Sequence, residues 1–258
     1  MKRTKIVATL GPASSELHVL EAMLHAGVNV FRVNFSHGDH AQHRTTIRNI
    51  REILDRTGLH AAILADLQGP KLRVGHVEEG AMVAPGDRIV FTNEACEGTK
   101  ERVYMTYAQF PKDVNPGEII LLDDGKLMMR VVSTNRKNEV VAEVVQGGAL
   151  LSKKGVNLPN TRVSLPCLTE KDLADLEVAL EENADWIGLS FVRSAQDIKE
   201  LRAILKKKKS NAGIIAKIEK PEAVSDIERI LDATDGVMVA RGDLGVEVPM
   251  ESVPLIQK

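Results

Sequence analysis

The stretch VMVARGDLG, residues 237–245, joins an apolar strand pattern to a charged turn. Its first four residues are short, apolar and partly β-branched, which is typical of a buried strand. Arg241, Gly242 and Asp243 follow at once. An Arg-Gly-Asp tripeptide also suggests an adhesion ligand, but that interpretation requires a secreted chain with the tripeptide on an exposed loop tip. A match this short carries little weight without context, so the rest of the chain must explain why the strand ends in opposite charges.

Composition excludes several classes of protein. The chain has 258 residues, a formal net charge of -2 and 43% hydrophobic residues, which is unlike a dedicated nucleic-acid binder. Cys96 and Cys167 alone do not make a disulfide framework. The N-terminal apolar stretch is interrupted by Gly11 and Pro12, too early for a signal peptide, and no apolar run is long enough to span a membrane. We expect a cytoplasmic protein without nucleic-acid or membrane partners, and we interpret Lys206–Lys209 as a solvated helix end.

Short apolar runs alternate with helical patterns at both ends of the chain. The expected strands cover residues 5–10, 28–35, 61–67, 185–191, 213–219 and 236–245. Between them, Pro-Gly-acid turns at residues 85–87 and 116–118 each lead into a strand, as in an all-β segment. The sequence therefore predicts an α/β fold of the (β/α)8 TIM type, truncated after about six βα units, with a small all-β lid domain inserted. The expected domains are residues 1–68 and 166–258 for the barrel and 69–165 for the lid.

Polar residues follow the apolar body of nearly every expected strand. They are Arg32, Asn34 and Ser36 for the second strand, Asp66 for the third, Ser190 and Arg193 for the fourth, Lys217 and Glu219 for the fifth, and Arg241, Gly242 and Asp243 for the sixth. In a parallel barrel the carboxyl ends of the strands meet on the face that carries the chemistry. A single pair of such residues could be a structural salt bridge, and Arg241 in particular could be a buried partner of a carboxylate. Polar residues at five strand ends favour a functional site over isolated structural salt bridges.

The fifth and sixth strand ends suggest a metal site. Glu219 and Asp243 offer hard oxygen ligands without a nearby His or Cys, which suits Mg²⁺ or Mn²⁺ better than zinc. Lys217 is two residues before Glu219, so both side chains should point to the same face of the strand. A lysine there could neutralise charge on a transferring group, and Gly242 would let a ligand approach the backbone closely. By contrast, His37, His40 and His43 show no metal-binding pattern, and we expect His40 and His43 to face solvent.

Six motifs in order carry a resemblance to a known family. They are FRVNFSHG (31–38), DLQGPKLR (66–73), LLDDGKL (121–127), SKKGVNLP (152–159), AKIE (216–219) and MVARGDLGVE (238–247). Together they resemble the pyruvate kinases, and the resemblance covers nearly the whole chain. It implies a (β/α)8 barrel, a β lid after the third strand and a C-terminal regulatory domain. It also implies glycolytic transfer of a phosphoryl group from phosphoenolpyruvate to ADP, giving pyruvate and ATP, with Mg²⁺ or Mn²⁺ as cofactor.

The resemblance implies a role for each matching residue. Arg32 would bind the substrate phosphoryl group, and Lys217 would be the catalytic residue that stabilises this group and the enolate. Glu219 and Asp243 would hold the divalent ion, and the Gly242 and Asp243 N–H groups would bind the substrate carboxylate. The implied nucleotide-binding residues are Asn34, Phe35, Ser36, His37, Arg73 and Lys154, with Asp124 as a lid residue close to the nucleotide.

The sequence departs from the family pattern at one residue. Asn34, Ser36, Asp66 and the Leu67 carbonyl match the family's monovalent-cation ligands, but Lys71 stands where potassium-dependent members have Glu. Since the ammonium could supply the positive charge, we expect activity without K⁺.

The resemblance also bears on what these 258 residues can do alone. It implies that the last barrel strands lie beyond Lys258, so we expect the isolated chain to be poorly stable or inactive, and the full-length protein to be a homotetramer. Two alternatives remain. One is a truncated, non-catalytic product that binds metal, substrate or a partner chain. The other is a different Mg²⁺-dependent barrel acting on phosphoenolpyruvate or pyruvate, which the lid, Arg73 and Lys154 disfavour because they imply a nucleotide.

Overall fold

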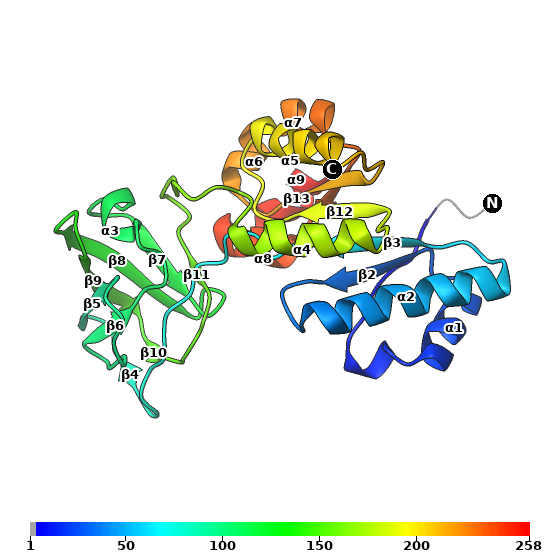
Figure 1. Cartoon of the computed structure of the whole chain (residues 1–258). Coiled ribbons are helices and arrows are strands. Elements are labelled where there is room, and N and C mark those ends of the chain that lie inside the picture. Colours follow the sequence, from blue (N-terminus) through cyan, green and yellow to red (C-terminus); the bar gives the residue numbers. More distant parts are fainter. Residues whose placement is uncertain (1–3) are drawn as a thin grey trace. The chain divides into compact units, whose positions relative to one another are not determined.

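The computed structural model describes residues 4–258, and the chain divides into two compact units (Figure 1). The first, here called the α/β unit, takes in the chain up to Pro70, Cys167–Ile218 and Glu222–Val239. The second, here called the β unit, takes in Lys71–Pro166, Glu219–Pro221 and Ala240–Lys258. The fold is thus of the mixed α/β class that the alternating pattern predicts.

A parallel six-stranded sheet forms the centre of the α/β unit, with strand order β1-β2-β3-β12-β13-β14. Its strands are β1 (Val7–Thr9), β2 (Val30–Asn34), β3 (Ala62–Asp66), β12 (Trp186–Leu189), β13 (Gly213–Ile218) and β14 (Gly236–Val239). The helices between them are η1 (Pro12–Ser14), α1 (Leu17–His25), α2 (His40–Thr57), α4 (Glu170–Glu181), α5 (Ala195–Lys207), α6 (Pro221–Ser225) and α7 (Ile227–Ala233). Every neighbouring pair of strands is parallel, as connections through helices require.

Alternation along the strands separates the helix-facing core from the opposite face of the sheet. Phe31, Ile63, Ile187 and Ile214 are each at most 1% exposed and pack in one hydrophobic cluster with the helices. Burying such a side chain contributes roughly 1.5–3 kcal/mol. The apolar stripe of α2 joins this cluster through Ile47, Ile50 and Ile53, as its helical spacing predicts. Residues one position along each strand point to the other face.

Capping residues fix where the helices begin. The Asp39 carboxylate accepts a hydrogen bond from the Gln42 N–H at 2.9 Å at the start of α2. Thr169 with Asp172 forms the capping box of α4, and Ser194 with Asp197 forms that of α5. These caps set the direction in which each helix leaves the carboxyl end of the preceding strand.

The β unit contains a six-stranded sheet with strand order β11-β7-β8-β9-β5-β6 and a separate β10-β4 pair. Its strands are β4 (Met82–Val83), β5 (Arg88–Thr92), β6 (Arg102–Tyr104), β7 (Ile119–Leu122), β8 (Leu127–Thr134), β9 (Glu139–Gln146), β10 (Gly148–Ala149) and β11 (Val156–Asn157). A second hydrophobic cluster, which includes Phe91 and Phe110, forms its core. The short helix α3 (Phe110–Asp113) was not predicted from the sequence.

The expected sixth strand is wrong beyond its first half. β14 ends at Val239, and Arg241–Glu247 forms the helix α8, followed by η2 (Met250–Ser252) and α9 (Val253–Gln257). Burial of Leu244 stabilises the helix, as do hydrogen bonds to the Glu247 carboxylate from Lys220 at 2.9 Å and Asn157 at 2.8 Å. Those partners are distant in sequence, so the local pattern does not reveal them.

Candidate functional site

Four neighbouring strands of the α/β unit bring together Arg32, Asp66, Ser190 and Lys217, here called the strand-end network. Arg32 lies in the middle of β2, whereas Asp66, Ser190 and Lys217 lie at or next to the carboxyl ends of their strands; all four are on the face opposite the helices. Because β2, β3, β12 and β13 are consecutive in the sheet, these four side chains can contact one another. The structure thus assembles four of the polar residues that the sequence placed at separate strand ends.

Asp66 is the centre of the strand-end network. Its Oδ2 accepts hydrogen bonds from Arg32 Nε at 2.7 Å and from Arg32 Nη2, and its Oδ1 is 3.1 Å from Lys217 Nζ. Lys217 Nζ also donates to Ser190 Oγ at 2.7 Å, and the Ser190 hydroxyl donates to the Leu67 carbonyl at 2.6 Å. Arg32 Nη1 donates to Thr9 Oγ1 at 2.8 Å, so the network also reaches β1.

Burial makes these charges depend on one another. Asp66 is 1% exposed, whereas the side chains of Lys217 and Arg32 are 10% and 22% exposed. A buried carboxylate is tolerated when it is paired and hydrogen-bonded, and here two cations surround it. The resulting cluster carries a net positive charge and holds Arg32 and Lys217 in fixed orientations. It can therefore attract and orient an anionic group such as a phosphate.

Asn34 is the last residue of β2, and Phe35, Ser36 and His37 follow it. The Asn34 side-chain oxygen accepts a hydrogen bond from the Ser36 N–H at 3.1 Å. His37 is exposed, Asn34 and Ser36 are half-buried, and the Phe35 side chain is buried. The expectation that His43 faces solvent is wrong, because it is 7% exposed and stacks on Phe35. Burial lowers the pKa of His43, against the opposing effect of the nearby Asp175 charge.

The predicted metal ligands lie in different environments. Glu219 directly follows β13 and is 1% exposed, whereas Asp243 lies in the exposed first turn of α8. Arg241 is exposed, so its expected role as a buried partner of a carboxylate is wrong. Around Gly242, an added Cβ would meet nothing within 4 Å, so a ligand has room to approach the backbone. No group of three or more His, Cys, Asp or Glu side chains suited to a metal occurs among residues 4–258.

Two carboxylates nevertheless match the chemistry of Mg²⁺. This ion usually binds one or two protein carboxylates and completes its coordination with water and substrate oxygens. Glu219 and Asp243 supply hard oxygen donors of that kind. Two carboxylates therefore suit a divalent ion that also binds substrate oxygens, and they suit a closed structural metal site less well.

In the β unit, Arg73 and Lys154 lie on adjacent segments. Arg73 forms an isolated antiparallel bridge with Gly155, and its Nη1 donates to the Lys153 carbonyl at 2.9 Å. Lys154 Nζ is 2.9 Å from Asp123 Oδ1. Hydrogen bonds from Lys126 and Lys154 lower the pKa of the Asp123 carboxyl, so it stays ionised. Arg73 and Lys154 thus place two cationic side chains on adjacent segments of the β unit.

Several residues near the strand-end network and the turns beside it were not predicted from the sequence. Thr9 closes a strand in the same way as the predicted residues, so the strand-end rule could have found it. Lys171, Asp172 and Asp175 lie on α4, where the sequence shows only the capping box and an ordinary charged face. Asp172 accepts a hydrogen bond from the Gly69 N–H at 2.9 Å, which fixes the turn after β3. Lys71 and Asp124 are exposed.

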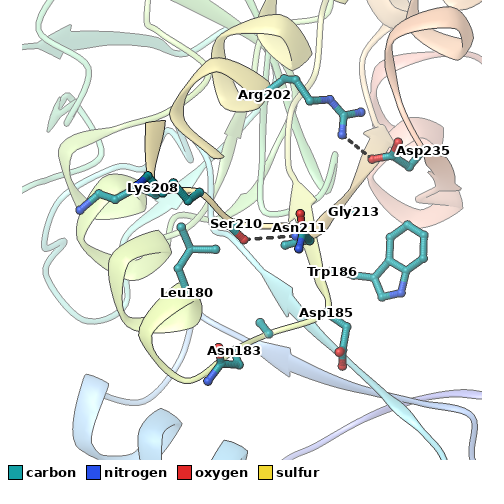
Figure 2. Close-up of a pocket in the computed structure, with 13 residues that line it drawn as sticks. Leu180, Asn183, Asp185, Trp186, Arg202, Lys208, Ser210, Asn211, Gly213 and Asp235 are labelled. Carbon is teal, nitrogen blue, oxygen red and sulfur yellow. Dashed lines mark hydrogen bonds and ion pairs between the residues drawn. The ribbon is translucent and has the colours of Figure 1, made fainter. Parts of the chain in front are cut away.

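A surface hollow lies at the other end of the strands (Figure 2). Trp186 and Gly213, the first residues of β12 and β13, line it, as do Arg202 and Asp235, which are paired at 2.7 Å. The hollow is therefore at the amino ends of these strands, whereas the strand-end network is at their carboxyl ends. In barrels of this class the amino end serves stability and the carboxyl end serves chemistry.

Within the part of the chain that the structure describes, none of the helices combines the length and apolar character needed to cross a bilayer.

Comparison with known proteins gives a consistent result. The whole chain, residues 1–258, matches the family model for the pyruvate kinase barrel domain. The pyruvate kinase of Corynebacterium efficiens is 48% identical over 258 residues, which covers all of this chain and 54% of that protein. Those of Geobacillus stearothermophilus and Staphylococcus aureus (strain MRSA252) are 47% and 44% identical over 260 residues, which covers all of this chain and 44% of each. The chain spans about half the length of these curated relatives. A match over every residue shows that this chain belongs to the pyruvate kinase family.

Proposed function

We propose that this chain is the barrel and lid portion of an enzyme that transfers a phosphoryl group from phosphoenolpyruvate to ADP in glycolysis. The observation that carries the proposal is the strand-end network, in which Arg32 and Lys217 are held around the buried Asp66. The family match over the whole chain supports it. The domain boundaries after residues 68 and 165, a cytoplasmic location and a homotetrameric full-length protein remain predictions that accompany the proposal.

In the proposed reaction, a β-phosphate oxygen of ADP attacks the phosphorus of phosphoenolpyruvate. The bond from phosphorus to the enol oxygen breaks, and the enolate then gains a proton at its methylene carbon to give pyruvate. Such a transfer depends on positioning and charge neutralisation more than on covalent participation of the protein. A fixed cationic network at the strand ends supplies both.

Arg32 and Lys217 have complementary roles in this proposal. A guanidinium carries five N–H donors, and Arg32 uses three of them on Asp66 and Thr9. Since the Arg32 side chain is 22% exposed, its outer edge can bind the substrate phosphoryl group. The Lys217 ammonium, oriented by Asp66 and Ser190, would stabilise charge on the phosphoryl group and the enolate.

The remaining roles follow the family resemblance. Glu219 and Asp243 would hold a divalent ion, Mg²⁺ or Mn²⁺, which supplies further charge neutralisation when bound. The Gly242 and Asp243 N–H groups would bind the substrate carboxylate. Arg73, Lys154 and the Asn34–His37 segment would bind the nucleotide phosphates.

Potassium independence is a separate proposal that rests on Lys71. Asn34, Ser36, Asp66 and the Leu67 carbonyl match monovalent-cation ligands of the family, but Lys71 brings its own positive charge. We expect added K⁺ to change turnover little. A large stimulation of turnover by K⁺, compared with a non-coordinating cation at equal ionic strength, would contradict this proposal.

Calorimetric titration of the chain with phosphoenolpyruvate and with ADP, each with and without Mg²⁺, tests the main proposal. We expect saturable binding of both ligands that weakens when Mg²⁺ is removed. The variant Lys217→Met should lose pyruvate formation, measured with lactate dehydrogenase and NADH, in any form of the protein that is active. Lys207→Met removes an exposed lysine near the end of α5 and is the matched control. If the protein, shown by circular dichroism to be folded, binds neither ligand, the proposal is wrong.

A further inference from the structure

Three contacts anchor the Asn34–His37 segment, and all of them converge on Phe35. The Phe35 N–H donates to the Asp66 carbonyl at 3.0 Å, and the Phe35 carbonyl accepts a hydrogen bond from Lys171 Nζ at 2.8 Å. The Phe35 ring stacks on His43 with 4.2 Å between the ring centroids. Both backbone polar groups and the side chain of Phe35 are therefore engaged within the protein.

Lys171 is itself held by a buried carboxylate. Its Nζ is 2.5 Å from Asp175 Oδ2, one helical turn along α4. Asp175 is 1% exposed, and its Oδ1 is 2.7 Å from His40 Nε2 on α2. Because a buried carboxylate needs partners, Asp175 fixes the position of the Lys171 ammonium. The chain of contacts thus runs from α2 and α4 to the Phe35 carbonyl.

This arrangement assigns different tasks to neighbouring residues of the segment. Phe35 is an anchor, since its ring is 1% exposed and its backbone groups are occupied. Ser36 is half-buried and His37 is exposed, so they can face a ligand. A hydrogen bond from a charged donor to a backbone carbonyl is stronger than one from a neutral donor. Lys171 therefore limits how far Ser36 and His37 can move.

We propose that Lys171 is a positioning residue for nucleotide binding, which holds the Phe35 carbonyl so that Ser36 and His37 are correctly placed for the phosphates of a nucleoside diphosphate. The proposal rests on the function proposed above and adds a residue outside the motifs that carry the family resemblance. Lys171 acts through Phe35 and does not itself contact the ligand. An alternative, purely structural role would stabilise the packing of α4 without affecting one ligand more than another.

Calorimetric titrations of the chain with Mg²⁺-ADP and with phosphoenolpyruvate separate these roles. The variants are Lys171→Met, which removes the ammonium, and Lys171→Arg, which keeps a cationic donor. Lys207→Met, at an exposed lysine of α5, is the control. Thermal unfolding of each variant shows whether the fold is retained.

For Lys171→Met we expect the Kd for Mg²⁺-ADP to rise about tenfold, equal to about 1.4 kcal/mol, while the Kd for phosphoenolpyruvate stays within about twofold. Lys171→Arg should recover most of the loss. The inference is overturned if Lys171→Met leaves the ADP affinity within about twofold of wild type, or if both affinities fall together with thermal stability. If the wild-type chain binds no ADP, the nucleotide part of the proposed function fails and this inference fails with it; ADP binding that is insensitive to Lys171 refutes the inference alone.

Discussion

Replacing Asp66 by Asn removes the charge at the centre of the strand-end network while keeping nearly the same volume. In the wild-type chain the Asp66 carboxylate pairs with Arg32 and Lys217, and all three side chains are largely buried. An amide oxygen can still accept hydrogen bonds, but it cannot neutralise two cations. The substitution therefore leaves two positive charges close together without their shared anion.

The expected loss follows from the burial of each partner. Removing one member of a buried ion pair typically costs about 3–5 kcal/mol. Arg32 is 22% exposed, so water screens part of its charge, and the low end of that range, about 3 kcal/mol, applies to Asp66→Asn. Lys217→Met should cost less, about 1–2 kcal/mol, because Asp66 keeps its hydrogen bonds from Arg32.

Urea unfolding followed by tryptophan fluorescence reports the stability of the α/β unit, which contains Asp66. Trp186 is the only tryptophan of the chain and lies in β12, next to β3, which carries Asp66. Asp232→Asn, at an exposed carboxylate on α7, is the matched control and should change the free energy of unfolding little. The reasoning is refuted if Asp66→Asn unfolds within about 1 kcal/mol of wild type, or if Lys217→Met costs more than Asp66→Asn.

Three further predictions follow from single residues. Burial and a hydrogen bond to Asp113 raise the pKa of Tyr107 to about 12. Phenolate absorbance should therefore show a late titration step that Tyr107→Phe removes. The free energy of unfolding should fall as pH rises from about 10 to 12, because in that range Tyr107 ionises only in the unfolded state. Burial lowers the pKa of His43 below 6.5, so the free energy of unfolding should decrease as pH falls through 6.5. In urea unfolding, His43→Phe should lack this decrease. If the variant shows the same pH dependence as the wild type, His43 is not the group responsible. Gly69 has a φ of +70°, and an added Cβ would stand 2.9 Å from the Phe191 ring, so Gly69→Ala should cost about 2 kcal/mol or more in the same assay.

Features that depend on local pattern could be predicted from the sequence. The alternation of apolar strands and amphipathic helices predicted the α/β class and the inserted β segment, because each element carries its own periodicity. The capping boxes at Thr169 and Ser194 are each complete within four residues, so a local pattern is enough to identify them. The end of the sixth strand was not predictable in this way. VARGDLGVE contains two glycines and β-branched residues, and its helix depends on Glu247 contacts with Lys220 and Asn157.

The same distinction explains which parts of the candidate site could be predicted. Arg32, Asp66, Ser190 and Lys217 lie on strands that are neighbours in the sheet and follow one another in chain order, so their proximity follows from parallel pairing and side-chain alternation. Contacts between helices have no fixed register of this kind, because they depend on how far each helix is shifted along its axis and rotated about it. The pair of His40 and Asp175, 135 residues apart, therefore could not be predicted, although it anchors Lys171 and through it the Phe35 carbonyl. The expectation that His43 faces solvent failed for a related reason: its burial depends on stacking against Phe35, which the helical spacing of α2 does not reveal, whereas His40 is exposed as expected.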